Sequence, residues 1–134
     1  MRVYLPTSLE ALATHLADGG IGPSPLHGHA VTEWLRAEWP DGSEDEWEYA
    51  VLMAAADDSR AWLPADARPR RVVLVAEVEG LTEDRDSTGV VLDSAVPLRL
   101  LLAVHADTED LDPAALDPGD LGWFAVQEIE DLIG

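Results

Sequence analysis

The stretch "RRVVLVAEVE" (residues 70–79) is the part of the chain that decides its architecture. Its centre, Val72–Ala76, is continuously apolar and rich in β-branched valine, which favours a β-strand. A strand with one face in water alternates apolar and polar residues, whereas a strand covered on both faces is apolar throughout. We therefore predict a central strand here, with other elements packed against both of its faces.

Other segments have weaker strand patterns. The N-terminal "MRVYLP" (1–6) alternates apolar and polar residues, and we expect Pro6 to end it, because proline cannot donate to a strand ladder. The polar stretch 80–89 is interpreted as a loop. The remaining predicted strands are 26–31, 90–96 and 98–107.

Helix starts are indicated by residues that cap free backbone N–H groups. The strongest predicted helix covers 43–62, where serine at the cap and glutamate three residues later can form a capping box. Two shorter helices are predicted at 8–18 and 33–39. The expected capping residues are Thr7 with Glu10, Thr32, and Ser43 with Glu46.

The predicted order of elements is β-α-β-α-α-β-β-β-α, with a final helix at 117–134. Helices followed by a run of strands and a closing helix are typical of α+β proteins, in which helices pack on one sheet. A length of 134 residues suits one domain. We therefore predict a single α+β domain (1–134) with one mixed β-sheet of about five strands. If the first two strands paired in parallel, their crossover would be right-handed.

The charge of the chain narrows the choice of partners. It has 27 acidic residues against 8 arginines and no lysine, which gives a net charge of −19. Such a chain repels phosphate backbones and anionic lipids, so we expect neither nucleic-acid nor membrane binding. A basic protein partner, a cation, or simple solubility all remain compatible with this charge.

Composition also indicates an origin. The chain lacks lysine, asparagine and cysteine and is rich in alanine, aspartate, leucine and arginine, a preference that matches GC-rich codons of a bacterial genome. Without cysteine, neither disulfides nor thiolate chemistry is available. The N-terminus has no apolar signal region, and no apolar run is long enough to span a membrane, so we expect a cytoplasmic protein.

Four residues are candidates for metal binding. His27 and His29 are two positions apart on a predicted strand and would point to one face. A metal site would need further ligands, for which His105 and Asp107 at the end of another strand are suitable types. The alternative interpretation is that these histidines are structural, lying in a loop or at a sheet edge and bonded to neighbouring groups. We expect no cofactor.

The final segment, "DPGDLGWFAVQEIEDLIG" (117–134), is predicted to be a helix because Asp117 before Pro118 is a favourable start. On a helical wheel Glu128 falls at the edge of the apolar face, so we expect a partly buried ion pair with Arg2 or Arg71. Trp123 and Phe124 fall outside the face toward the sheet. They are predicted to be covered by the preceding long helix or by a second subunit.

Several segments together resemble a known family. These are "MRVYLPTSLEALATHL", "AVTEWLR", "EYAVLMAA", "RRVVLVAEV", "VHAD" and "WFAVQEIEDL", in this order along the chain. They are similar to a family of short actinobacterial proteins classed as a domain of unknown function. The resemblance implies a cytoplasmic actinobacterial protein, but no activity and no catalytic residues. The "HGH" stretch (27–29) lies outside the matching segments.

Three functions are compatible with these observations. The first is a non-catalytic interaction or structural protein that self-associates as a homodimer, because no catalytic motif is present and the final segment has surplus apolar surface. The second is an acidic mimic that binds the basic surface of a nucleic-acid-binding partner. The third is a metal-dependent enzyme that uses His27, His29, His105 and Asp107.

Overall fold

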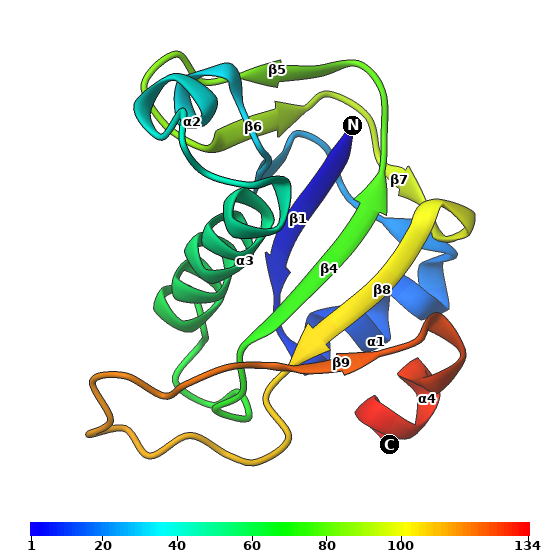
Figure 1. Cartoon of the computed structure of the whole chain (residues 1–134). Coiled ribbons are helices and arrows are strands. Elements are labelled where there is room, and N and C mark those ends of the chain that lie inside the picture. Colours follow the sequence, from blue (N-terminus) through cyan, green and yellow to red (C-terminus); the bar gives the residue numbers. More distant parts are fainter.

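The computed structural model describes residues 1–134 and contains one large sheet packed between helices (Figure 1). Seven of its nine strands form the large sheet, in the order β5-β6-β3-β1-β4-β8-β9, and β2 and β7 form a small second sheet. The strands are β1 (Arg2–Thr7), β2 (Gly20–Ile21), β3 (Leu26–His29), β4 (Val72–Glu77), β5 (Leu81–Glu83), β6 (Gly89–Leu92), β7 (Val96–Pro97), β8 (Leu101–Ala106) and β9 (Gly122–Phe124).

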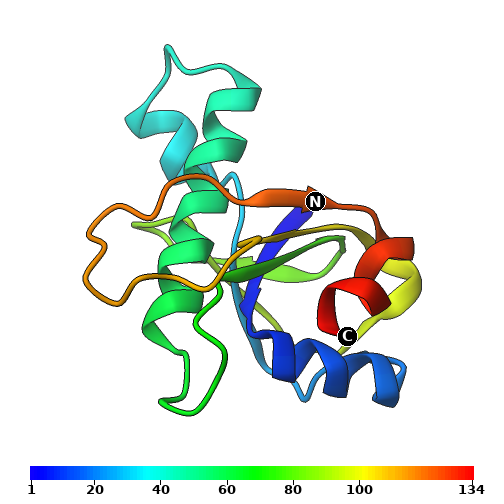
Figure 2. The ribbon, with the colours of Figure 1, turned by 90° about the horizontal axis from the view of Figure 1, so that it is seen from below.

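The helices cover both faces of the large sheet. One face packs against the long helix α3, and the opposite face packs against α1 and α4 (Figures 1 and 2). None of these helices is both long enough and apolar enough to cross a membrane. The helices are α1 (Leu9–Asp18), α2 (Glu33–Glu38), α3 (Glu44–Ala61) and α4 (Ile129–Ile133), and short 3₁₀ turns cover Leu98–Leu100 and Val126–Glu128.

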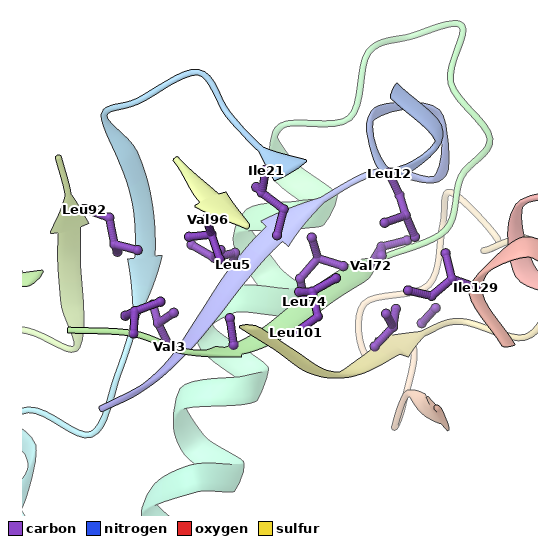
Figure 3. Packing of buried hydrophobic residues seen from close by; sticks show 14 of the residues in the cluster. Val3, Leu5, Leu12, Ile21, Val72, Leu74, Leu92, Val96, Leu101 and Ile129 are labelled. Carbon is purple, nitrogen blue, oxygen red and sulfur yellow. The ribbon is translucent and has the colours of Figure 1, made fainter. Parts of the chain in front are cut away.

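Strand β4 is the central strand that its sequence predicts. Its alternate residues Val72, Leu74 and Ala76 are buried in the core on the α1 and α4 side (Figure 3). Its other residues, Val73 and Val75, are buried in a second core beneath α3. The continuous apolar run therefore reflects burial on both faces, as expected for such a strand.

The capping residues are mostly those predicted. Thr32 caps α2, and Ser43 with Glu46 forms the complete capping box of α3. The N-cap of α1 is Ser8 rather than the predicted Thr7. Strand β1 continues through Pro6 to Thr7, which leaves Ser8 as the first residue able to accept the Ala11 N–H group.

The predicted α+β class is confirmed, but the predicted sheet differs in pairing and in strand number. All the strand pairs are antiparallel, so the sheet is not mixed. β1 and β3 are neighbours, but they pair as antiparallel strands. Part of the predicted loop 80–89 forms the short strand β5, which pairs with β6 as a hairpin.

The prediction of a final helix over 117–134 is wrong for most of its length. Gly119 has φ of +83°, a left-handed conformation that cannot continue a helix. Residues Gly122–Phe124 then pair with β8 as the edge strand β9, and only Ile129–Ile133 is α-helical. Bulky aromatic residues favour this half-buried strand, and a short apolar segment does not distinguish strand from helix by its periodicity.

Candidate functional site

A pocket of about 370 Å³ lies between the C-terminal end of α3 and strands β3, β5 and β6. Asp58, in the last turn of α3, and Trp62, which is its C-cap, form one wall. The strand register provides the other wall, because His27 and Thr82 both pair with Val91 and therefore lie on one face of the sheet. The rest of the lining is Gly28, His29, Glu83, Asp84, Gly89 and Val90.

His29 is held between two side chains at the edge of this pocket. Its Nε2 lies 2.6 Å from Asp58 Oδ2, and its Nδ1 lies 2.8 Å from Thr88 Oγ1. Both ring nitrogens are therefore engaged, and the imidazole side chain is only 16% exposed. His27 lies on the same face but is exposed. The sequence prediction that both histidines point to one face is confirmed.

Close packing beneath the histidines explains the glycine between them. A Cβ atom on Gly28 would lie 2.8 Å from both Leu5 Cδ2 and the carbonyl oxygen of Tyr4. No side chain fits at such distances without a shift of the neighbouring strand β1. Gly28 therefore lets β3 approach β1, and the alternation of side chains along β3 places His27 and His29 on the other, pocket side of the sheet.

The charged groups of the pocket are mostly carboxylates. Asp58, Glu83 and Asp84 line it, and none of the eight arginines does. Glu83 Oε1 accepts the Glu33 N–H at 2.9 Å, and Asp84 Oδ2 accepts the Ser87 hydroxyl at 3.0 Å. These bonds orient the carboxylates without neutralising them, so the pocket presents negative charge to solvent.

The four residues predicted as metal ligands are not brought together. His27 and His29 lie on β3, whereas His105 lies on β8 and Asp107 follows it. Two strands, β1 and β4, separate β3 from β8, so the two pairs are roughly 14 Å apart across the sheet. No group of three or more histidine, aspartate or glutamate side chains in the structure is arranged to hold a metal ion.

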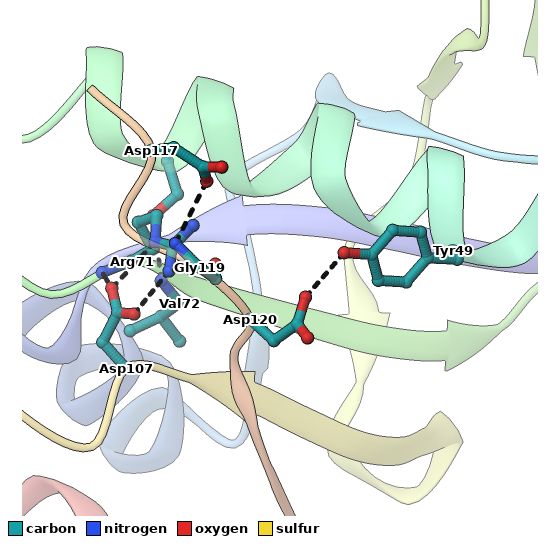
Figure 4. Close-up of polar contacts among 8 residues, drawn as sticks. Tyr49, Arg71, Val72, Asp107, Asp117, Gly119 and Asp120 are labelled. Carbon is teal, nitrogen blue, oxygen red and sulfur yellow. Dashed lines mark hydrogen bonds and ion pairs between the residues drawn. The ribbon is translucent and has the colours of Figure 1, made fainter. Parts of the chain in front are cut away.

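Asp107 instead forms a buried ion pair with Arg71 (Figure 4). Its Oδ1 accepts a hydrogen bond from Arg71 Nη2 at 2.6 Å, and its Oδ2 accepts from Arg71 Nε at 2.9 Å. Arg71 Nη2 also donates to the carbonyl oxygen of Gly119. The sequence offers a signal for this pair, since Arg71 directly precedes one buried strand and Asp107 directly follows the strand beside it.

Two groups near this ion pair have shifted pKa values. Burial lowers the pKa of His105, which is half-buried on β8. Tyr49 on α3 donates a hydrogen bond of 2.6 Å to Asp120 Oδ1, and this bond raises the pKa of the phenol (Figure 4). The loop before β9 is thus bonded to α3 through Asp120 and to the start of β4 through Gly119.

The predicted ion pair of Glu128 with Arg2 or Arg71 is wrong. Glu128 is exposed, and its Oε1 accepts the N–H group of Ala125 at 2.9 Å. Arg2 pairs with Glu48 of α3, and Arg71 pairs with Asp107. The prediction failed because it rested on a helical wheel. Glu128 is instead the last residue of a 3₁₀ turn, and its side chain bonds back to Ala125 at the start of that turn.

Trp123 and Phe124, predicted as interface residues, have different surroundings. Successive residues of a strand face opposite sides of the sheet. Phe124 packs against the core on the α1 and α4 side. Trp123 pairs with His105 on the opposite face and is 61% exposed. The structure thus leaves the indole of Trp123 free on the edge strand.

Fold and pocket together define a small α+β protein with one large antiparallel sheet and a solvent-open acidic pocket at the end of its longest helix. The chain belongs to a family of unknown function (DUF6912), whose model matches residues 1–133. The resemblance to an uncharacterised family is confirmed by this match. No curated protein and no solved structure matches the chain.

Proposed function

We propose that this chain is a non-catalytic interaction protein that binds a positively charged protein partner. The observation that carries the proposal is the pocket at the end of α3, which is lined by three carboxylates and by no arginine or lysine. Solvent-facing carboxylates without arginine neighbours favour the approach of a cationic group. His29 is held in the wall of this pocket by hydrogen bonds from both of its ring nitrogens, to Asp58 and to Thr88.

The charge of the rest of the chain also favours the binding of a basic partner. Against 27 acidic residues there are only 8 arginines. Half of these arginines already form ion pairs with carboxylates of the chain, namely Arg2, Arg36, Arg70 and Arg71. The remaining excess of carboxylates creates a negative field over the surface, and such a field accelerates the association of a basic partner.

Calorimetric titration with an arginine- and lysine-rich peptide tests this proposal. The control is a peptide of equal length in which glutamine replaces each basic residue. We expect only the basic peptide to bind, with an affinity that falls as salt rises, because the screening length shortens from about 30 Å at 0.01 M to about 8 Å at 0.15 M. Equal binding of both peptides, or no binding at low salt, would overturn the proposal.

A narrower form of the proposal concerns partners whose basic surface also binds nucleic acid. The chain would then occupy that surface in place of a phosphate backbone. Duplex DNA should displace the chain from such a partner, and the chain should displace DNA at matched concentration. If the chain and DNA bind a basic DNA-binding domain simultaneously, this narrower form is wrong.

A second candidate function is self-association through the edge strand β9, and the exposure of Trp123 favours it. Tryptophan is enriched among residues that dominate interface energies, yet Trp123 is 61% exposed. β9 is the last strand of the sheet, so one of its edges is open to pairing with a second copy. Phe124 would stabilise such an interface only indirectly, since it packs into the core.

The two candidate functions respond to salt in opposite ways, and sedimentation velocity can measure the response of self-association. Two copies with a charge of −19 repel one another, so screening should strengthen self-association while it weakens binding of a basic partner. We expect a dimer fraction that grows with salt in the unaltered chain and is lost in Trp123→Ser. A chain that stays monomeric at every salt and protein concentration excludes this candidate.

We also propose that the chain acts in the cytoplasm of an actinobacterium. The proposal is supported by the codon preference inferred from composition and by the resemblance of six segments to actinobacterial proteins. Fractionation of a GC-rich actinobacterium that expresses the chain tests it, and recovery outside the cytoplasmic fraction would contradict it.

A further inference from the structure

One guanidinium group of the chain, that of Arg36, contacts both an indole ring and a carboxylate. The Cζ atom of Arg36 lies 4.7 Å from the centroid of the Trp47 ring, and Arg36 Nη2 lies 3.1 Å from Glu44 Oε1. The carboxylate and the indole both come from the first turns of α3, three residues apart. A guanidinium is attracted to the face of an aromatic ring and to the oxygens of a carboxylate, so the two contacts reinforce each other.

The pocket at the other end of α3 contains the same two groups. Asp58 and Trp62 are four residues apart, which places them on one side of the helix, and both line the pocket. Asp58 holds His29 through Oδ2, while its Oδ1 accepts no hydrogen bond within the chain. Trp62 is 57% exposed. None of the chain's own arginines lines this pocket, in contrast to the Arg36 site.

The opposite wall of the pocket adds further acceptors. Glu83 on β5 uses Oε1 for the backbone of Glu33 and leaves Oε2 free of hydrogen bonds within the chain. Asp84 and the hydroxyl of Thr82 line the same wall. A planar cation that contacts Trp62 on one side could therefore donate to carboxylates on both walls. The pocket volume of about 370 Å³ leaves room for the end of a long side chain.

We propose that this pocket binds the guanidinium of an arginine side chain presented by the partner, with Asp58 and Trp62 as the main contacts and Glu83 as the opposing acceptor. The inference rests on the proposed function, because it names the group of the basic partner that is recognised. Arginine is favoured over lysine because its planar fork stacks on indole and pairs with carboxylate, whereas an ammonium is a compact point charge. The Arg36 site supports the same choice.

The test is a titration with N-acetyl-arginine N-methylamide, followed by the NMR signals of the five tryptophan indole N–H groups. Matched ligands are the lysine compound and the citrulline compound, which keeps the shape of arginine but carries no charge. We expect the arginine compound to shift the Trp62 signal and to bind about tenfold more tightly than the lysine compound. The citrulline compound should not bind. Equal affinities for all three compounds would overturn the inference.

Variants separate the pocket from the rest of the acidic surface. Trp62→Ala and Glu83→Gln should each weaken binding of the arginine compound, by about tenfold for Trp62→Ala. The control Trp123→Ala removes another exposed indole and should leave binding unchanged. Glu83→Gln serves as a second test if Trp62→Ala fails to fold, which circular dichroism would show.

The same variants distinguish failure of this inference from failure of the proposed function. If a basic peptide binds the unaltered chain and Trp62→Ala with equal affinity, the pocket is not the recognition site, but the chain still binds a basic partner. If the basic peptide does not bind at all, the proposed function fails. If the arginine compound binds at Trp62 and the basic peptide binds Trp62→Ala more weakly, both this inference and the proposed function are supported.

Discussion

Arg71 and Asp107 form a bidentate ion pair between the start of β4 and the end of β8, with only 1% and 7% of their side chains exposed. Asp107 Oδ2 also accepts the backbone N–H of Arg71 at 2.7 Å, and Arg71 Nη2 reaches the carbonyl of Gly119. A buried ion pair is tolerated when its remaining polar atoms are bonded in this way. The pair therefore joins two central strands to the loop that precedes β9.

Removal of one partner of this pair should be costly. Asp107→Ala leaves the Arg71 guanidinium buried without its counter-charge, and we expect a loss of about 3–5 kcal/mol in the free energy of unfolding. Urea denaturation followed by circular dichroism measures this loss. The matched control is Glu44→Ala, which removes the exposed partner of Arg36 and should cost less than about 1 kcal/mol. Equal losses in both variants would contradict a special role for the buried pair.

The central part of the fold could be predicted from sequence because its signals are local and redundant. The uniform apolarity of Val72–Ala76 predicts burial on both faces, and the capping box of Ser43 and Glu46 predicts the start of α3. These signals depend on few long-range contacts. Strand order does depend on them, and nothing in the sequence pattern of β5 indicates that it pairs with β6.

The final segment and the pocket could be predicted only in part. Asp117-Pro118 is a good helix start, but Gly119 turns left-handed where its carbonyl meets Arg71, and this contact lies 48 residues away in the chain. The pocket joins the end of α3 to strand β3 and to the β5–β6 hairpin, which lie in separate parts of the sequence. The spacing of His27 and His29 indicates their common face, but it does not indicate Asp58 as the partner of His29.

The stability of the protein should depend on pH through His105. Burial lowers the pKa of His105 in the folded protein below the ordinary value of 6.5. Between the folded pKa and 6.5 the unfolded chain binds more protons than the folded chain, so stability is lost as the pH falls through this window. We therefore expect His105→Gln to lose less stability than the unaltered chain between about pH 7.5 and pH 5.5.

The measurement for His105 is the difference in unfolding free energy between the two pH values, determined for both proteins by urea denaturation. Comparison of the two proteins cancels the titration of the many surface carboxylates, which they share. If the unfolding free energies of His105→Gln and of the unaltered chain change equally with pH, His105 has the same pKa in the folded and unfolded states.

Gly28 should be intolerant of any side chain. In Gly28→Ala the new Cβ would lie 2.8 Å from Leu5 Cδ2 and from the Tyr4 carbonyl, so β3 must move away from β1. We expect a loss of about 1–3 kcal/mol in thermal or urea denaturation, the usual cost of overpacking. The neighbouring substitution His27→Ala changes an exposed residue of the same strand and should alter stability by less than about 0.5 kcal/mol. A Gly28→Ala variant as stable as His27→Ala would show that the two strands separate without cost.

The left-handed conformation of Gly119 provides the last prediction. Its φ of +83° is unfavourable for a residue with a Cβ atom, and two hydrogen bonds hold it there, one from Arg71 Nη2 to its carbonyl and one from its N–H to Asp117 Oδ1. Nothing lies within 4 Å of an added Cβ, so alanine would suffer only backbone strain. We expect Gly119→Ala to cost about 1 kcal/mol in urea denaturation. Asparagine adopts the left-handed region more readily, so Gly119→Asn should recover part of this loss. If alanine and asparagine destabilise the protein equally, backbone conformation is not what requires glycine beside the buried ion pair.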